Sequence, residues 1–238
     1  MKGVHVIYET HDFIAVNKPS GILSIPDRFD DTKFSLYKYL QSKYDQIYII
    51  HRLDKETSGL ILFAKNANTH AYFSEIFEKR KVVKYYLGIV VGSLTVTQGN
   101  IHEAIAEHQY HKGVMVLSKK GKPSVTHFEV LQDFGIFSLV KFQIETGRTH
   151  QIRVHMKYAG HPIVADTIYG DGKPVMVSSF KKKYRVNKDE EERPLLNRLA
   201  LHSFQLKFQD NSGEQRLLEC ELAKDMKALS QQLKKNRK

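Results

Sequence analysis

The amino-acid sequence predicts a single α+β domain with a mixed, mostly antiparallel central sheet flanked by helices and loops. Strand-like segments follow one another between residues 100 and 145 with short links, whereas parallel pairs would need long crossovers. Apolar residues recur at helical spacing elsewhere, as in residues 34–40. No repeat, low-complexity linker or clear domain boundary interrupts the 238 residues, so we expect one domain over residues 1–238.

The individual elements are predicted from periodicity and from the residues that bound each segment. Short apolar or β-branched runs predict strands at residues 4–7, 13–16, 59–64, 82–92, 101–106, 114–118, 124–131, 136–145, 199–208 and 216–222. Helical spacing predicts helices at residues 34–40, 71–81 and 149–160 and in a basic, fraying tail at about 224–238. Asn66 or Asn68 is expected to cap the second helix, and Thr149 and Gly160 the two ends of the third.

The charge balance points to a polyanionic partner. Lys and Arg number 37 against 26 Asp and Glu, which gives a formal net charge of +11. No apolar run approaches the roughly 20 residues that span a bilayer, and the N-terminus lacks the apolar core of a secretory signal. The single cysteine, Cys220, excludes internal disulfides and cysteine-rich zinc sites. We therefore expect a cytoplasmic, monomeric protein that binds nucleic acid and no membrane.

One stretch combines ionisable side chains with a buried strand. Arg52 and Asp54 directly precede the apolar run that starts at Gly59. Charged groups beside a buried element are costly to desolvate unless they pair. Two interpretations are open on spacing alone: a structural ion pair between Arg52 and Asp54, or a reactive Asp54 carboxylate kept ionised by a cation.

Other kinds of site lack sequence support. The chain contains 12 histidines but no His-Glu-x-x-His pattern, so we expect no catalytic metal. It also lacks a GxxxxGK[ST] loop, a GxGxxG fingerprint and a GxSxG elbow, so we expect neither a nucleotide cofactor nor that type of serine hydrolase. The hypothesis of an enzyme therefore depends on Asp54.

The stretch around Asp54 resembles a known signature. His51-Arg52-Leu53-Asp54-Lys55-Glu56-Thr57-Ser58-Gly59 is similar to the H-R-L-D-x-x-T-S-G motif of the RluA family of pseudouridine synthases. Further stretches that resemble this family in order along the chain are Asn17–Gly21, Lys84–Leu87, Glu145–His155, Gly160–Ile163, Asp166–Gly170 and Leu199–His202. The resemblance covers about residues 5–222, and several motifs in one order make chance similarity improbable.

The resemblance implies the pseudouridine synthase catalytic fold and the isomerisation of uridine to pseudouridine within tRNA or rRNA, without cofactor or metal. The family's catalytic aspartate corresponds to Asp54, and the arginine that pairs with it corresponds to Arg153. Tyr86 corresponds to the tyrosine that lies against the uracil face. Arg52 corresponds to the arginine that enters the base stack and holds the displaced RNA open.

RNA binding is expected to involve further side chains. A uridine in a folded stem must be flipped out at a cost of a few kcal/mol, which phosphate contacts can offset. The candidate RNA-binding residues are His51, Arg52, Thr57, Lys18, Arg148, His150, Lys157 and the turn at 119–122. The charge-dense run at 181–193 is expected to be a solvated surface segment that could touch RNA.

Two alternatives to an RNA-modifying enzyme follow from the same residues. One is a catalytically inactive RNA-binding protein of the same fold, which would not need the set Asp54, Tyr86 and Arg153. The other is an enzyme similar to a nucleoside hydrolase, whose free nucleoside substrates would not explain the basic excess. Many RluA-family members carry an N-terminal S4 domain. Because this sequence starts directly with the catalytic motifs, we expect a stand-alone catalytic domain.

Overall fold

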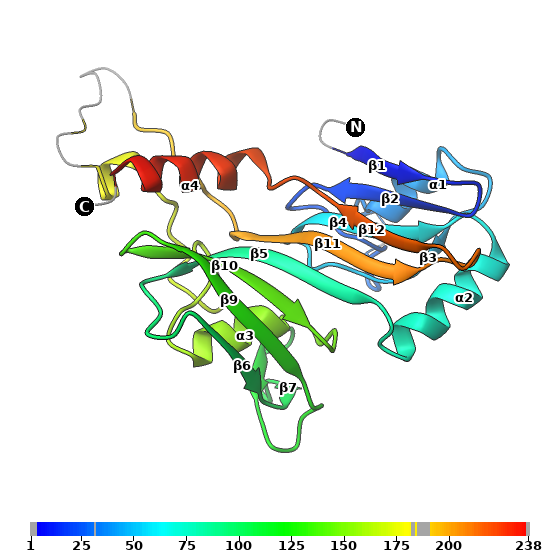
Figure 1. Cartoon of the computed structure of the whole chain (residues 1–238), viewed down its shortest axis with the longest axis horizontal. Coiled ribbons are helices and arrows are strands. Elements are labelled where there is room, and N and C mark those ends of the chain that lie inside the picture. Colours follow the sequence, from blue (N-terminus) through cyan, green and yellow to red (C-terminus); the bar gives the residue numbers. More distant parts are fainter. Residues whose placement is uncertain (1–3, 31, 182–183, 185–190, 237–238) are drawn as a thin grey trace. The chain divides into compact units, whose positions relative to one another are not determined.

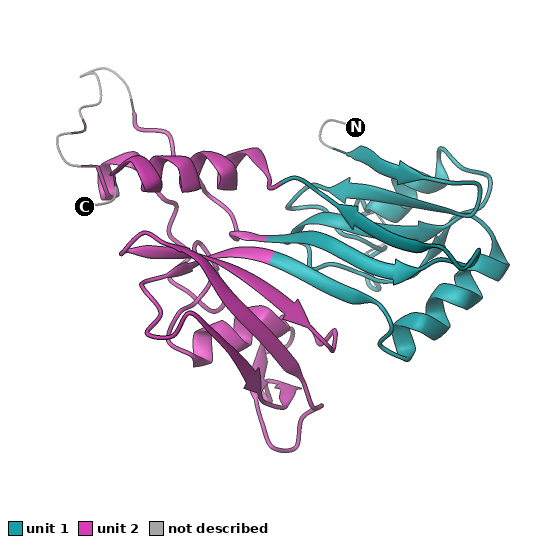
Figure 2. Ribbon diagram, in the orientation of Figure 1, with its two compact units in different colours: residues 1–86, 202–221 teal, residues 87–201, 222–238 magenta. Residues whose placement is uncertain are grey.

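The computed structural model describes residues 4–30, 32–181, 184 and 191–236. The chain forms two compact units, coloured separately in Figure 2. Unit 1 comprises Met1–Tyr86 and His202–Glu221, and unit 2 comprises Leu87–Leu201 and Leu222–Lys238. The single domain expected from the sequence stays a prediction. Most of the charge-dense run at 181–193 lies outside the described residues.

Unit 1 contains a mixed sheet and two helices (Figure 1). The elements are β1 (His5–Glu9), β2 (Phe13–Lys18), α1 (Leu36–Gln41), β3 (Tyr48–Ile49), β4 (Ser58–Ala64), α2 (Ala67–Glu78), the first residues of β5 (Val83–Val91), β11 (Leu201–Gln209) and β12 (Gln215–Glu219). The strand order is β1-β2-β4-β11-β5, with β3 on β4 and β12 on β11. The β4–β11 pair is parallel, whereas the β1–β2, β2–β4 and β11–β12 pairs are antiparallel.

The apolar run in β4 is continuous because this strand lies inside the core of unit 1. All seven residues of β4 are buried, so neither face of this strand is solvated. Phe13 of β2, Phe73 of α2 and Phe208 of β11 meet edge to face, with centroids 5.4–5.8 Å apart. The strand that follows Asp54 is therefore held in a packed core, as the sequence predicts.

A glycine allows β11 to approach β4. Gly59 has φ +109°, and a Cβ atom there would lie 2.2 Å from the carbonyl oxygen of Ser203. Next to it, the buried hydroxyl of Ser58 lies 2.9 Å from Nδ1 of His202. The Ser-Gly end of the motif therefore joins two strands that are far apart in the sequence.

Unit 2 contains an antiparallel sheet, a small hairpin and two helices. Its elements are β6 (Gln98–His102), β7 (Ile105–Glu107), β8 (Met115–Leu117), β9 (Val125–Asp133), β10 (Phe137–Ile144), α3 (Gln151–Tyr158), a 3-10 turn (Val177–Ser179) and α4 (Lys224–Asn236). The order is β5-β10-β9-β6, while β7 and β8 form a separate hairpin. The strand predicted at 101–106 is wrong as one element, since the chain leaves the sheet after His102 and the Glu103 carbonyl accepts a hydrogen bond from Ser124.

The predicted helix ends are partly confirmed. Asn66 caps α2 by accepting from the Thr69 N–H at 2.8 Å, and Gly160 follows α3 with φ +84°. Thr149, however, does not cap α3: the N-cap residue is His150, in the left-handed conformation with φ +55°. The Gln151 side chain organises this end instead, because its Oε1 accepts from the Arg148 N–H at 3.1 Å.

The basic tail forms a packed helix through residue 236. Met226, Leu229 and Leu233 are buried along one face of α4, and Arg198 forms an ion pair with Asp225 at its start. The described part of this segment is therefore anchored along its length. None of the helices among the described residues is long and apolar enough to cross a membrane.

Candidate active site

The loop that carries Asp54 is fixed on both sides of the carboxylate. Before it, the Ser24 hydroxyl accepts from the Leu53 N–H at 3.0 Å and donates to the Leu53 carbonyl at 2.9 Å. After it, the Lys55 carbonyl accepts from the Lys18 ammonium and from the Gly21 N–H, both at 2.9 Å. Asp54 itself is half-buried. A short loop therefore presents this carboxylate with little backbone freedom.

Lys18 supports this loop from inside the protein. Its side chain is fully buried, with 0% exposure, and its ammonium also donates to the carbonyls of Pro19 at 3.0 Å and Ile22 at 2.7 Å. A buried ammonium needs such partners, because an uncompensated charge in the interior is costly. In this structure Lys18 offers no surface to a phosphate, so the predicted RNA contact is replaced by a role in positioning the Asp54 loop.

His51 is also part of the scaffold. Its Nε2 accepts a 3.0 Å hydrogen bond from the Leu62 N–H in β4, and its ring stacks on Phe77 with centroids 4.9 Å apart. Burial, with a smaller effect of the Lys84 charge, lowers the pKa of His51 to about 3. The ring is therefore neutral near pH 7 and cannot attract a phosphate as a cation. Thr57, a second predicted RNA contact, is only 2% exposed.

Tyr86 belongs to unit 1, as Asp54 does, and the charge of Asp54 acts on its phenol. Burial, and then the negative charge of Asp54, raise the pKa of the Tyr86 phenol well above its usual range. A hydrogen bond between the hydroxyls of Tyr86 and Ser203 partly opposes this rise in the pKa. The phenol is therefore protonated at any physiological pH. Ser203, whose hydroxyl also donates to the Leu60 carbonyl at 2.9 Å, carries no obvious sequence signal.

Arg52 is exposed on the same loop. Within the part of the chain that the structure describes, no ion pair joins Arg52 to Asp54. The interpretation of these two residues as a structural ion pair is therefore wrong. An exposed guanidinium two residues before the carboxylate remains available to a ligand.

In unit 2, Arg153 forms a buried, bidentate ion pair with Asp166. Its Nε and Nη2 donate to Oδ2 and Oδ1 of Asp166, both at 2.7 Å, and the two residues are 3% and 0% exposed. Burial alone would raise the pKa of Asp166, but the guanidinium and the N–H groups of Ile168 and Tyr169 outweigh it and lower the pKa. Asp166 begins one of the stretches that resemble the family, but the sequence assigned it no role as the partner of Arg153. The pairing of Arg153 with Asp54, a residue of unit 1, stays a prediction.

Only some of the other predicted RNA-binding residues of unit 2 line one groove. Arg148 is half-buried and its Nε donates to the Pro123 carbonyl at 3.3 Å. A groove of about 500 Å³ is lined by Ile105, Ala106, Glu107, Met115, Lys120, Gly121, Lys122, Gly147, Arg148 and Thr149. Two lysines and one arginine against one glutamate give it a net positive lining, which suits a phosphate backbone. His150 and Lys157 do not line it; both lie against Tyr169.

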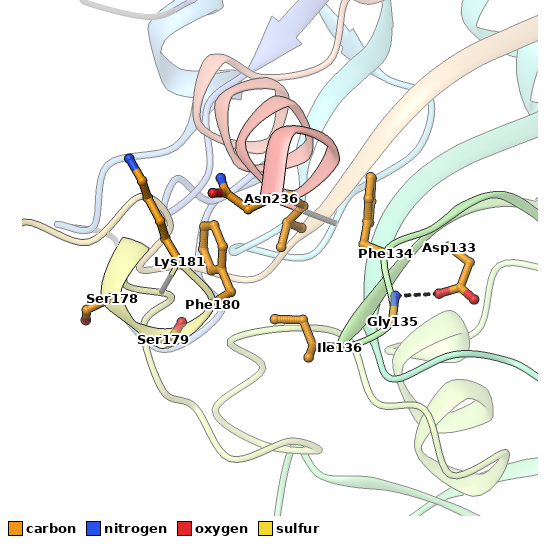
Figure 3. Close-up of a pocket in the computed structure, with 10 residues that line it drawn as sticks. Asp133, Phe134, Gly135, Ile136, Ser178, Ser179, Phe180, Lys181 and Asn236 are labelled. Atoms are coloured by element: carbon orange, nitrogen blue, oxygen red, sulfur yellow. Dashed lines mark hydrogen bonds between the residues drawn. The ribbon is translucent and has the colours of Figure 1, made fainter. Parts of the chain in front are cut away.

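Another cavity of unit 2 holds none of the predicted site residues. It has a volume of about 560 Å³ and lies between the β9–β10 turn, the 3-10 turn and the end of α4 (Figure 3). Phe134, Ile136, Phe180 and Leu233 give it an apolar wall. Cavity size therefore does not mark the predicted site. Among the described residues, no group of three or more His, Cys, Asp or Glu could hold a metal ion.

Comparison with known proteins places the chain in a family. Residues 12–158 match the family described as RNA pseudouridylate synthase. Over 241 residues the chain is 32% identical to "Ribosomal large subunit pseudouridine synthase D" of Vibrio cholerae, which covers 99% of this chain and 72% of the relative. The protein of the same name in Buchnera aphidicola is 36% identical over 188 residues, 77% of this chain and 59% of the relative. The chain belongs to the RNA pseudouridylate synthase family, and its resemblance to the RluA branch is confirmed.

Solved structures agree with this assignment. The structure described as "Human RNA Pseudouridylate Synthase Domain Containing 4" has a TM-score of 0.73 and 27% identity, with 96% of this chain and 92% of that chain covered. "Human RNA Pseudouridylate Synthase Domain Containing 1" has a TM-score of 0.68 and 26% identity, with 98% and 95% covered. The predicted α+β fold is thus confirmed. In length, the chain spans 59% of the Buchnera relative and 62% of its Borreliella burgdorferi counterpart.

Proposed function

We propose that this protein isomerises uridine to pseudouridine within structured RNA, with the Asp54 carboxylate as the essential group. The observation that carries the proposal is the Asp54 loop itself. Hydrogen bonds from Ser24 and Lys18 fix the residues on both sides of the carboxylate, and Tyr86 lies within reach of its charge. A half-buried carboxylate on a fixed loop, whose charge reaches an aromatic side chain, suits chemistry on a flat base.

The reaction is an isomerisation and needs no external reactant. The bond between N1 of uracil and C1′ of the ribose breaks, the base rotates, and a bond forms between C5 and C1′. The proton on C5 is lost and N1 gains one, so atoms and charge balance. Whether the Asp54 carboxylate attacks the sugar, attacks the base or removes a sugar proton, it must be ionised.

Tyr86 and Arg52 are proposed to act on the displaced base and the stem that it leaves. A ring against the uracil replaces part of the stacking lost on flipping, and a neutral phenol does so without adding charge. The exposed Arg52 guanidinium can enter the stack in place of the uridine. Both contributions offset a flipping cost of a few kcal/mol.

The RNA backbone is proposed to follow the basic groove of unit 2. Lys120, Lys122 and Arg148 line this groove, and the net charge of +11 favours binding at low salt. The names of the relatives favour large-subunit ribosomal RNA as the substrate, with transfer RNA as the second candidate. Action on such RNA fits the cytoplasmic location expected from the sequence.

The test is direct detection of the product. The protein is incubated with an in vitro transcript of large-subunit ribosomal RNA or with unmodified transfer RNA transcripts, and the RNA is digested to nucleosides and separated. We expect pseudouridine from one of the two classes. RNA binding without pseudouridine from either class would favour the inactive RNA-binding protein instead.

A further inference from the structure

Tyr169 contacts several of the elements that form the proposed RNA-facing part of unit 2. Its side chain is only 5% exposed. The hydroxyl oxygen accepts a 2.8 Å hydrogen bond from the Met115 N–H in β8 and lies 2.8 Å from Nδ1 of His150 at the start of α3. The ring packs against Val154 and Ile105 in one small cluster. One side chain therefore joins the β7–β8 hairpin to α3.

The same ring also constrains the Arg153 guanidinium. The guanidinium carbon lies 5.0 Å from the ring centroid, while the Asp166 carboxylate binds the guanidinium edge through two hydrogen bonds. The Tyr169 backbone N–H donates to Oδ1 of Asp166 at 3.0 Å, which ties both constraints together. A carboxylate at the edge and a ring against the group restrict both its position and its rotation.

The backbone around this arrangement adopts uncommon conformations. Among the described residues other than glycine, positive φ occurs at Arg80, His150 and Ala165. Two of these three lie close to the ion pair in the sequence: His150 is three residues before Arg153, and Ala165 is one residue before Asp166. Such conformations persist where surrounding contacts over-determine them, and they gather at functional sites.

The hydroxyl and the ring of Tyr169 therefore face different tasks. The hydroxyl accepts a hydrogen bond from the Met115 N–H, and Met115 lines the basic groove together with Arg148. The ring holds Arg153. We propose that Tyr169 is a positioning residue for RNA modification: its hydroxyl sets the hairpin wall of the groove that binds RNA, and its ring orients the Arg153 guanidinium for the reaction. This inference rests on the proposed function and adds a residue to it.

Two variants separate the two tasks. Tyr169→Phe keeps the ring and removes the hydroxyl, whereas Tyr169→Leu removes both. Tyr158→Phe is a control for the loss of a tyrosine hydroxyl, because Tyr158 ends α3, the helix that carries Arg153, and is 64% exposed. Single-turnover rates are measured over a range of concentrations of the large-subunit ribosomal RNA transcript. In parallel, NMR follows the Met115 amide exchange rate and the Arg153 Nε–H resonance in the free protein.

For Tyr169→Phe we expect the half-saturating RNA concentration and the Met115 amide exchange rate each to rise about fivefold, because one hydrogen bond is lost. The saturating rate and the Arg153 Nε–H resonance should stay unchanged. Tyr169→Leu should also shift the Arg153 resonance and lower the saturating rate at least about tenfold, because the guanidinium loses its orientation. Tyr158→Phe should match the wild type throughout.

The proposal is overturned if both Tyr169 variants lower the saturating rate equally, or if Tyr169→Phe leaves RNA affinity and Met115 exchange unchanged. A purely structural role would reduce thermal stability without this split between affinity and rate. The NMR measurements do not depend on activity. A wild-type protein that makes no pseudouridine would thus refute the proposed function. The Met115 amide exchange rate and the Arg153 Nε–H resonance would still support or overturn the positioning by Tyr169.

Discussion

The ammonium of Lys18 donates a 2.9 Å hydrogen bond to the carbonyl oxygen of Lys55, the residue that follows Asp54. This contact joins the end of β2 to the loop before β4 across 37 residues of sequence. Because Lys18 is fully buried, its charge acts on the protein's own backbone. The position of the proposed catalytic carboxylate therefore depends on a lysine that the sequence suggested as an RNA contact.

Replacing Lys18 with Met should impair the reaction more than RNA binding. The variant leaves three backbone carbonyls without their ammonium partner, so we expect about 3 kcal/mol less unfolding free energy in urea. The saturating rate should fall at least about tenfold as Asp54 loses its placement. RNA affinity, measured by filter binding, should stay within about twofold, since a buried residue makes no phosphate contact.

Lys55→Met provides the control for this experiment. Lys55 is exposed and its side chain makes only a 3.9 Å ion pair with Glu56, so its loss should change stability by less than about 0.5 kcal/mol. If Lys18→Met weakens RNA binding as much as it lowers the rate, Lys18 contacts RNA and the positioning role is incorrect.

Gly59→Ala should destabilise unit 1 through a collision of backbones. The added Cβ would lie 2.2 Å from the Ser203 carbonyl oxygen, where no flexible side chain can move away. Gly113→Ala is the matched control, because it also has positive φ, +81°, but has open space around it. In urea unfolding we expect a loss of about 1 kcal/mol at Gly113 and more than about 3 kcal/mol at Gly59. Equal losses would show that φ alone decides the effect and that the close approach is unimportant.

His51 should make stability depend on pH in the acidic range. Its pKa is about 3 in the folded protein against 6.5 in the unfolded chain. Between these values the unfolded state binds a proton that the folded state does not, so the unfolding free energy falls as the pH falls. The contribution is complete above pH 6.5 and decreases by about 1.4 kcal/mol per pH unit below it.

The measurement is urea unfolding at pH 7.5 and pH 5 for the wild type and His51→Gln. The Gln side chain can still accept from the Leu62 N–H but does not titrate. The loss between the two pH values should be about 2 kcal/mol larger in the wild type. An identical loss in both proteins would mean that His51 is protonated in the fold.

Arg153 should be tested together with Asp166. Arg153→Ala alone would leave a fully buried carboxylate unpaired, at a cost of about 3–5 kcal/mol that obscures any effect on the reaction. The double variant Arg153→Met/Asp166→Asn removes both charges and keeps an acceptor for the Ile168 and Tyr169 N–H groups. We expect it to fold and bind RNA but to lose activity. A parallel loss of RNA affinity would make Arg153 a phosphate contact.

Much of the fold follows from local sequence signals. The buried strand β4, the hairpin of β1 and β2 and the Asn66 cap of α2 are all confirmed, since each depends on residues adjacent in the chain. The cap predicted at Thr149 is wrong because the N-cap residue is His150, in the left-handed conformation and without a side-chain cap hydrogen bond. Local rules rank candidate caps by residue type and do not include such a backbone conformation.

The partners of charged residues could not be predicted in the same way. The carboxylate Asp166, paired with Arg153, and the three carbonyls around Lys18 depend on which segments the fold brings together. Charge and spacing gave Lys18, His51 and Thr57 the same status as Arg148. The structure separates these residues. Lys18 and His51 form hydrogen bonds with the protein's own backbone, and Thr57 is buried, whereas Arg148 lines a groove.

Tritium release shows directly whether Asp54 carries out the isomerisation. Ribosomal and transfer RNA transcripts labelled with tritium at uridine C5 are incubated with the wild type, with Asp54→Asn and with Asp45→Asn, a change at an exposed aspartate. We predict that the wild type and Asp45→Asn release tritium to water at equal rates and that Asp54→Asn, folded and bound to RNA, releases none. Release by Asp54→Asn at the wild-type rate would show that the Asp54 carboxylate is not needed for the reaction.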